Sequence, residues 1–339
     1  MSINFIHLAD THLGAEYTVR PRTLKERRGK DFFHNYELAL QPAFDGNINF
    51  VIHSGDLFNR SKPPLDVITK AYEPLINVAQ HGLPVFLIPG NHERSFFPRG
   101  LLLSHPNIHV FYQPETVVFR ENDYLIAITG IPFVRKNARD VFRNYLKLSC
   151  WKTKIADIRI LLVHQIFDNA IVGPHGYVFR KGEEVISRKD IPPDFDYVAA
   201  GHVHPHQYLE NPFNKNQKIC YSGSIDRISF AEINEDKGYI KGTIDGNSIS
   251  TKFFKLPVKQ MLLFTWNVNE LDSRSLQSKM EKVFQDLNPM SICRIKLIGS
   301  EKYLKFAKQE AHKFVSCMPN TAIIQIYSSN GQFNKYNSE

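Results

Sequence analysis

The sequence predicts an α/β protein in which two β-sheets pack as a two-sheet sandwich, followed by a smaller βαβαβ domain of the α+β type. Three observations predict this fold class. Short apolar segments first alternate with amphipathic ones, closely spaced apolar segments follow, and a regular strand and helix alternation resumes after Leu256-Pro257. The 339 residues also exceed the roughly 250–300 residues that one hydrophobic core usually supports.

The first part of the chain predicts parallel strands joined by helices. Apolar runs of strand length occupy Ile3–Leu8, Phe50–His53 and Pro84–Ile88. Between them, Asp31–Phe44 and Leu65–Ala79 have apolar residues at helical spacing. Strand–helix–strand order of this kind is typical of a parallel sheet.

From about residue 107 the chain predicts a second sheet. Six apolar runs are expected to be strands: Ile108–Phe111, Thr116–Phe119, Leu125–Thr129, Arg159–Val163, Tyr197–Ala200 and Ile219–Tyr221. The Asp245-Gly246 dipeptide predicts the turn of a further hairpin. Packing of this sheet on the first one is expected, which favours a sandwich over a barrel.

The C-terminal part predicts a second domain. Its expected elements, in chain order, are the strand Met261–Trp266, the helix Asp272–Leu287, the strand Ile292–Ile298, the helix Lys302–Val315 and the strand Ala322–Tyr327. We therefore expect a first domain over residues 1–257, a second over 258–328 and a flexible tail over 329–339.

Composition excludes several classes of protein. The content of 42% hydrophobic and 22% charged residues predicts a folded core and excludes a disordered or fibrous chain. No run of about 20 apolar residues and no signal-peptide pattern is present, so neither membrane insertion nor secretion is expected. The four cysteines form no CxxC pair, which favours a reducing cytoplasm. The net charge of +8 favours a polyanionic partner without deciding for one.

Metal-type ligands follow five of the predicted strands, at the edge where open α/β sheets place their sites. They are Asp10 and His12, Asp56, Asn91 with the neighbouring His92, His164, and the pair His202 and His204. Carboxylate, imidazole and amide ligands without a thiolate favour Mn, Fe or Zn over Cu, and Asp56 is placed to bridge two ions. Each motif alone is weak, since a buried histidine is usually a satisfied core group. Their combination and order favour a dinuclear metal site.

These motifs resemble the calcineurin-like metallophosphoesterase superfamily. Within it, the sequence is similar to the SbcD-type nucleases, the bacterial relatives of the eukaryotic meiotic recombination eleven nuclease. The similarity is carried by ADTHLG at 9–14, GDLF at 55–58, GNHE at 90–93, AAGHVHPHQ at 199–207 and YSGSIDRISFAE at 221–232.

The resemblance implies two divalent ions, with Mn²⁺ expected, and a metal-bound hydroxide as nucleophile without a covalent enzyme intermediate. It assigns one ion to Asp10, His12, Asp56 and His204, and the other to Asp56, Asn91, His164 and His202. His92 matches the catalytic histidine, which stabilises the phosphate or protonates the leaving oxygen. The chain departs from the family pattern at Asn59, where many archaeal members have histidine, and at Glu93, where aspartate is commoner.

Two segments are candidates for DNA contacts. The first follows the ADTHLG motif and carries Arg20, Arg22, Arg27 and Arg28, which could neutralise phosphates or could be an ordinary solvated segment. The second is a glycine-rich loop carrying Tyr177, Arg180 and Lys181, which combines a stacking ring with cations. Its alternative interpretation is a packed aromatic loop. The resemblance also implies that the C-terminal domain caps the active site and helps to hold DNA. The excess of Lys and Arg over Asp and Glu in this domain agrees with that role.

We therefore expect a metal-dependent DNA exonuclease or endonuclease in DNA end processing, repair or defence, acting in the cytoplasm at the nucleoid. The alternatives are a phosphomonoesterase or a cyclic-nucleotide phosphodiesterase of the same superfamily, and a non-catalytic scaffold, which the complete ligand set disfavours. The resemblance implies a homodimer, for which Leu65–Ala79 is the candidate helix. It also implies an SbcC-type ATPase or a helicase as partner. No docking segment is seen after Tyr327, so we expect the protein to act alone or to meet a partner through its nuclease or cap surface.

Overall fold

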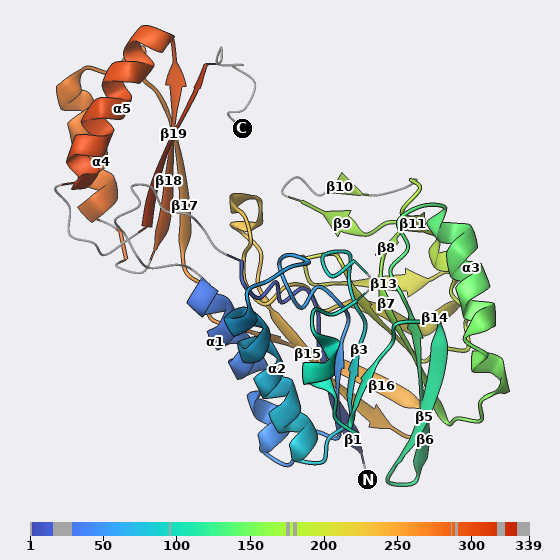
Figure 1. The fold of residues 1–339 in the computed structure, drawn as a ribbon. Helices are drawn as coiled ribbons and strands as arrows, with labels where there is room; N and C mark the ends of the chain where they lie inside the picture. The colour runs from blue at the N-terminus through green and yellow to red at the C-terminus, as the bar shows by residue number, and fades with distance from the viewer. Residues whose placement is uncertain are drawn as a thin grey trace. The chain divides into compact units, whose positions relative to one another are not determined.

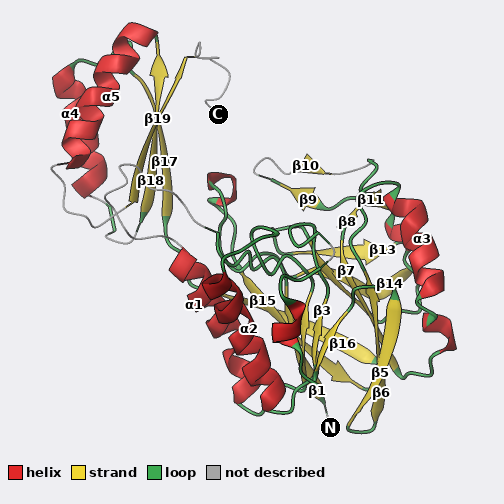
Figure 2. Ribbon diagram, viewed as in Figure 1, coloured by secondary structure: helices red, strands yellow, loops and turns green. Residues whose placement is uncertain are grey.

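The computed structural model describes residues 2–15, 29–94, 96–173, 177–178, 182–285, 287–288, 291–316 and 323–330. The chain divides after Pro257 into two compact units, each with its own sheet or sheets and its own core (Figures 1 and 2). No helix in these ranges is long and apolar enough to cross a membrane.

The first sheet of the larger unit has six strands in the order β16-β15-β1-β2-β3-β4. The parallel strands are β1 (Ile3–Leu8), β2 (Phe50–His53), β3 (Val85–Leu87) and β4 (Ile108–Val110). The antiparallel hairpin is formed by β15 (Gly238–Asp245) and β16 (Ser248–Lys255). Its turn contains Gly246 at φ +57°, as the Asp-Gly dipeptide predicts.

Two helices pack on the outer face of this sheet, α1 (Gly29–Leu40) and α2 (Leu65–Gln80). The buried residues Phe32, Tyr36 and Leu40 of α1 recur at helical spacing. The predicted helix runs to Phe44, whereas α1 ends at Leu40 and a 3₁₀ turn covers Gln41–Phe44. Pro42 explains the difference, because its ring clashes with the carbonyl four residues earlier and it has no N–H to donate.

The second sheet also has six strands, in the order β13-β14-β12-β7-β6-β5. Its strands are β5 (Glu115–Glu121), β6 (Tyr124–Ile131), β7 (Ile158–His164), β12 (Tyr197–Gly201), β13 (Gln207–Asn211) and β14 (Asn214–Tyr221). The outer face is covered by α3 (Ala138–Leu148), whose Phe142 and Leu146 are buried among residues of β7 and β12. This helix was not predicted from the sequence.

The two sheets bury a shared core between them, so the predicted sandwich is confirmed. Ile3 and Phe5 of β1 point toward this core with Ile158 and Ile160 of β7. The residue after Phe5, Ile6, points to the opposite face of the sheet and belongs to the core under α1 and α2. The remaining short strands are β8 (Ile166–Phe167), β9 (Ile171–Val172), β10 (Tyr177–Val178) and β11 (Val185–Ile186); the remaining 3₁₀ turns are Gly100–Leu103, Trp151–Thr153, Arg188–Asp190 and Phe230–Glu232.

The smaller unit is a three-stranded parallel sheet with two helices on one face (Figure 2). In chain order its elements are β17 (Met261–Asn267), α4 (Ser273–Gln285), β18 (Ile292–Gly299), α5 (Glu301–Ser316) and β19 (Ile323–Asn330). The last strand continues beyond the predicted end at Tyr327, because its backbone stays paired with β18 as far as Asn330 opposite Gly299.

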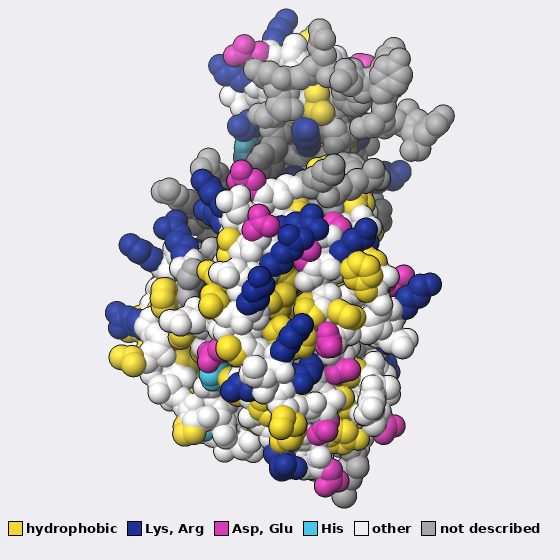
Figure 3. All heavy atoms as spheres, turned by 90° about the vertical axis from the view of Figure 1, so that its right-hand side faces the viewer, with side chains coloured by type: hydrophobic (Ala, Val, Ile, Leu, Met, Phe, Trp, Pro, Cys, Tyr) yellow, Lys and Arg dark blue, Asp and Glu magenta, His cyan; other side chains and the backbone are white. Residues whose placement is uncertain are grey.

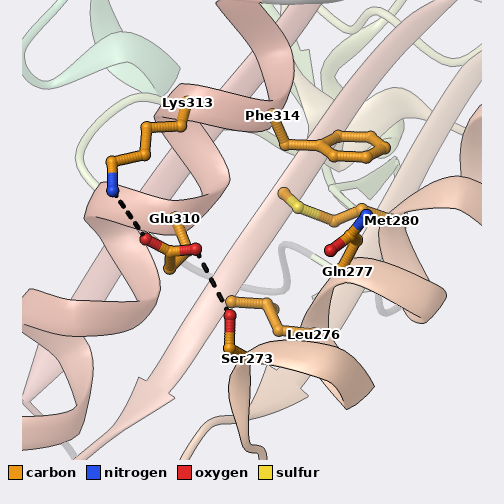
Figure 4. A pocket seen from close by; sticks show the side chains of 7 residues that line it. All are labelled: Ser273, Leu276, Gln277, Met280, Glu310, Lys313 and Phe314. Atoms are coloured by element: carbon orange, nitrogen blue, oxygen red, sulfur yellow. Dashed lines mark hydrogen bonds and ion pairs between the residues drawn. The ribbon is translucent and has the colours of Figure 1, made fainter.

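A groove of about 360 Å³ lies between α4 and α5 (Figure 4). Its apolar lining includes Leu276, Met280 and Phe314. At its rim, Glu310 accepts a hydrogen bond from Ser273 at 3.3 Å and pairs with Lys313 at 3.0 Å. This lining has the character of a helix interface rather than of a metal or phosphate site.

Candidate metal centre

The metal-type side chains gather at the carboxyl ends of β1, β2, β3, β7 and β12. The parallel register places Leu8 beside His53 in the first sheet and Gly201 beside His164 in the second. The loops that follow these strand ends therefore meet at one edge of the sandwich. The structure brings together all the residues predicted to bind metal, namely Asp10, His12, Asp56, Asn91, His164, His202 and His204.

The set assigned to the first ion converges on a small volume. One ligand atom from each of Asp10, His12 and His204 lies within 4.8 Å of the others. The Nε2 atoms of His12 and His204 are 3.1 Å apart, and His12 Nε2 is 3.9 Å from Asp56 Oδ2. Asp10 is also oriented by the His202 backbone N–H, which donates to its two oxygens at 3.1 and 3.0 Å.

The set assigned to the second ion converges in the same way and shares Asp56 with the first. His164 Nε2 is 3.3 Å from Asp56 Oδ2, 3.0 Å from Asn91 Oδ1 and 3.2 Å from His202 Nδ1. The Asp56, His164 and His202 ligand atoms also lie within 4.8 Å of one another. Asp56 therefore lies between two overlapping groups of ligands, the arrangement that a bridging carboxylate requires.

The hydrogen bonds around this cluster fit bound cations. His164 Nδ1 donates to the Ser54 carbonyl at 2.7 Å, which leaves the Nε2 lone pair of its neutral ring directed into the cluster. Nitrogen and oxygen acceptors then face one another at about 3 Å in a buried space. Such an arrangement needs positive charge between these atoms, supplied by a proton or by a cation, and the hard and borderline donor set suits a divalent metal ion.

The pKa shifts of Asp56 and His164 also indicate that the cluster favours positive charge. Burial alone raises the pKa of Asp56, but His164 and the other imidazoles lower it below its usual range. Burial alone lowers the pKa of His164, but the carboxylate of Asp56 raises it to about 9. Burial lowers the pKa of His202 to about 3 and raises the pKa of Asp10 to about 6. A proton on His164 thus occupies the electrostatic role that a metal ion would take over.

The backbone of the cluster is held in unusual conformations. Asp10, His12, Asp56 and His202 all have positive φ, at 50°, 44°, 54° and 89°. Such conformations cost on the order of 1–3 kcal/mol each for non-glycine residues and concentrate at functional sites. The surrounding sandwich therefore holds these ligands in place at the expense of folding stability.

Two glycines let the ligand loops approach one another. A Cβ atom at Gly90 would fall on the Asp56 carboxylate, and one at Gly201 would fall on the Ser54 carbonyl oxygen. The same Cβ atom at Gly201 would also lie 2.8 Å from His164 Nδ1. Neither position can accept a larger side chain without moving a predicted ligand.

His92 lies at the open side of the cluster. Its side chain is 34% exposed, whereas that of Asp56 is 2% exposed. Its Nδ1 donates to the Asn59 carbonyl at 2.7 Å, which directs Nε2 toward the site, 3.9 Å from Asp56 Oδ2. His92 can therefore contact a substrate that approaches from solvent. One ring nitrogen of His92 also lies within 4.8 Å of ligand atoms of His12 and Asp56.

The two departures from the family pattern have structural roles. Asn59 supports His92 through its backbone carbonyl, a contact that does not depend on the side chain at this position. Glu93 is buried and accepts hydrogen bonds from the N–H groups of Phe58 and Gly90, both at 2.7 Å. Burial raises the pKa of Glu93 to about 8, assisted by the nearby Asp56. Glu93 thus links the loop of Asp56 to the loop of His92.

Most of the predicted DNA contacts lie outside the described residues. These are Arg20, Arg22, Arg27, Arg28, Arg180 and Lys181. Tyr177 lies in β10 and is 63% exposed. The face of the larger unit that carries α3 shows Lys and Arg side chains interspersed with Asp and Glu (Figure 3). Part of that charge is neutralised internally, because Arg139 and Arg143 both pair with Asp190 at 2.6 Å.

Several residues around the cluster were not assigned a role from the sequence. Phe133 packs its ring against His202 and His164, with centroid distances of 5.5 and 5.9 Å. Glu232 accepts a hydrogen bond from His204 Nδ1 at 2.9 Å. Glu232 is the last residue of the YSGSIDRISFAE motif, and its place in that motif is the signal by which it could have been found. No spacing rule links Phe133 to the ligands.

Comparison with known proteins agrees with this geometry. The sequence pattern of the calcineurin-like phosphoesterase family matches residues 3–206. Three archaeal relatives carry the name DNA double-strand break repair protein Mre11. The protein from Methanococcus maripaludis is 29% identical over 76% of this chain and 67% of its own length. The proteins from Sulfolobus acidocaldarius and Methanocaldococcus jannaschii are 25% and 28% identical, over 88% and 79% of this chain and 75% and 73% of their own lengths.

The match to the family pattern extends over more than half of the 339 residues. It contains all seven predicted metal ligands, from Asp10 to His204. The chain belongs to the calcineurin-like phosphoesterase family.

Proposed function

We propose that this protein is a metal-dependent DNA nuclease that hydrolyses phosphodiester bonds with two divalent ions, Mn²⁺ being the preferred metal. The observation that carries the proposal is the pair of overlapping ligand groups that share Asp56 and open to solvent beside His92. The names of the archaeal relatives support DNA as the substrate.

The residues have distinct roles in this proposal. Asp10, His12 and His204 would hold one ion, Asn91, His164 and His202 would hold the other, and Asp56 would be the ligand that both ions share. When bound, the ions supply Lewis-acid polarisation of the phosphodiester and activate a water molecule as the nucleophile.

His92 acts on the substrate rather than on the ions. Its Nδ1–H donates to the Asn59 carbonyl, so the ring is held with Nε2 facing the site. In the protonated state Nε2 can donate to a phosphate oxygen or pass its proton to the leaving oxygen. The partial exposure of His92 allows both the contact and proton exchange with solvent.

End-labelled single- and double-stranded DNA, incubated with the purified protein in excess chelator and then with Mn²⁺ or Ca²⁺, tests the proposal. We expect no cleavage in chelator and restoration by Mn²⁺ more than by Ca²⁺, whose preference for an all-oxygen site fits this set poorly. Asp56→Asn should abolish cleavage, while Asp123→Asn, in the exposed β5–β6 turn, should leave it unchanged.

Cleavage that persists undiminished in chelator would refute the two-ion mechanism. Hydrolysis of a phosphomonoester or a cyclic nucleotide without cleavage of DNA would instead assign the same metal centre to a small substrate.

A further inference from the structure

A buried chain of polar side chains lies behind His204. His204 Nδ1 donates to Glu232 Oε1 at 2.9 Å, and Glu232 Oε2 lies 2.9 Å from the ammonium of Lys237. Lys237 also pairs with Glu235 at 2.7 Å. Lys237 is 1% exposed and Glu232 is 7% exposed, so the chain lies almost entirely away from solvent.

This arrangement holds the Glu232 carboxylate in one orientation. Its Oε2 atom receives both the Lys237 ammonium and the backbone N–H of Ile228, the latter at 3.0 Å. The other oxygen, Oε1, remains for His204. Burying an ammonium costs several kcal/mol unless it is well paired, so the buried Lys237 is stable here because two carboxylates neutralise it.

The orientation of Glu232 selects the tautomer of His204. A carboxylate oxygen only accepts, so the proton of the neutral imidazole must be on Nδ1 and the lone pair on Nε2. That Nε2 atom is 3.1 Å from His12 Nε2, inside the ligand group of the first ion. Carboxylates that hold a ligand histidine in this way also increase its basicity toward the metal.

We propose that Glu232 and Lys237 are positioning residues that hold His204 as an Nε2 ligand, so that occupancy of the first ion site depends on them while the second does not. The proposal rests on the two-ion site of the proposed function. It makes the YSGSIDRISFAE segment a support of the metal centre.

Glu232→Gln tests this with little change of shape. Because Lys237 and the Ile228 N–H both donate to the Oε2 position, the amide oxygen should take that position and turn its NH₂ group toward His204 Nδ1. The imidazole proton is then forced onto Nε2, where it opposes the metal. Asp236→Asn is the matched control, since the exposed Asp236 carboxylate pairs with Lys255 and lies outside the chain of contacts from Lys237 to His204.

Calorimetric titration of the chelator-treated full chain with Mn²⁺, without DNA, measures the two affinities. Electron paramagnetic resonance reports whether the ions form a coupled pair. We expect Glu232→Gln to weaken one ion by roughly 10–100-fold, to leave the other unchanged and to replace the coupled signal with that of an isolated ion. Asp236→Asn should bind both ions as the wild type does.

Urea denaturation of the metal-free variants establishes that they fold. A folded Glu232→Gln variant that binds both ions normally, or that loses affinity equally at both sites, would overturn the proposal. A wild-type protein that binds fewer than two ions would refute the two-ion site itself. Lack of DNA cleavage with intact two-ion binding would refute only the choice of substrate.

A measurement on the wild type makes the test independent of the variants. In protein loaded with Zn²⁺ and labelled with ¹⁵N-histidine, nuclear magnetic resonance should show His204 protonated at Nδ1 and coordinated through Nε2. Coordination through Nδ1 would overturn the proposal.

Discussion

Replacing Gly201 by alanine should disrupt the second ion site through a single methyl group. Gly201 ends β12 beside His164, and its missing side chain leaves room for the Ser54 carbonyl. An added Cβ would fall on that carbonyl oxygen and lie 2.8 Å from His164 Nδ1. The hydrogen bond of 2.7 Å that orients His164 runs between these two atoms, so the methyl group displaces both of its partners.

The expected cost follows from these contacts. Overpacking a rigid buried site costs about 1–3 kcal/mol, and loss of the His164–Ser54 hydrogen bond adds about 1 kcal/mol. We therefore expect Gly201→Ala to lower the free energy of unfolding by about 2–4 kcal/mol. Because His164 is a predicted ligand of one ion only, affinity for that ion should fall far more than affinity for the other.

Urea denaturation of the metal-free protein and calorimetric titration with Mn²⁺ measure the two effects. Gly246→Ala is the control: Gly246 has φ +57° and open space around it, so it should lose about 1 kcal/mol of stability without affecting either ion. Gly201→Ala protein that is as stable as the wild type and binds both ions unchanged would refute the packing argument.

Three further predictions concern His92, Asp56 and the buried histidine His7. His92→Gln should keep both ions, measured by calorimetry, and slow DNA cleavage by about 10²–10⁴-fold through loss of acid or electrostatic assistance; loss of both ions would make it a ligand instead. Asp56→Asn should bind neither ion tightly, because the shared carboxylate is removed; retention of two tight ions would contradict a bridging role. Burial lowers the pKa of His7 to about 3, so below pH 6.5 the unfolded chain takes up a proton that the folded chain does not. Stability should fall as the pH decreases from about 6.5 to 3, and His7→Gln should reduce that slope by about 1.4 kcal/mol per pH unit; parallel urea-derived slopes at pH 4–6 in chelator would contradict this.

The sequence predicts the position of the cluster well because that position follows from topology. An apolar run such as Ile3–Leu8 is bounded by polar residues, and the ligands Asp10 and His12 come directly after it. Since the carboxyl ends of parallel strands meet at one edge, ligands distant in sequence are expected to converge.

Other features depend on tertiary contacts that no local pattern contains. The Ser54 carbonyl that orients His164 is a backbone group 110 positions away, and Lys237 is placed behind His204 by folding alone. The helix Ala138–Leu148 was missed for another reason. Its buried Ala138, Phe142 and Leu146 recur every fourth residue among predominantly polar neighbours, a sparse pattern between two strand predictions.

The central claim is that Asp56 bridges two divalent ions held by the strand ends of the sandwich. Anomalous diffraction at the manganese edge, from crystals grown with Mn²⁺, tests it most directly. We predict two peaks about 3.5–4 Å apart, both in contact with Asp56, one beside His204 and the other beside His164. A single peak, or two peaks of which only one contacts Asp56, would contradict the claim.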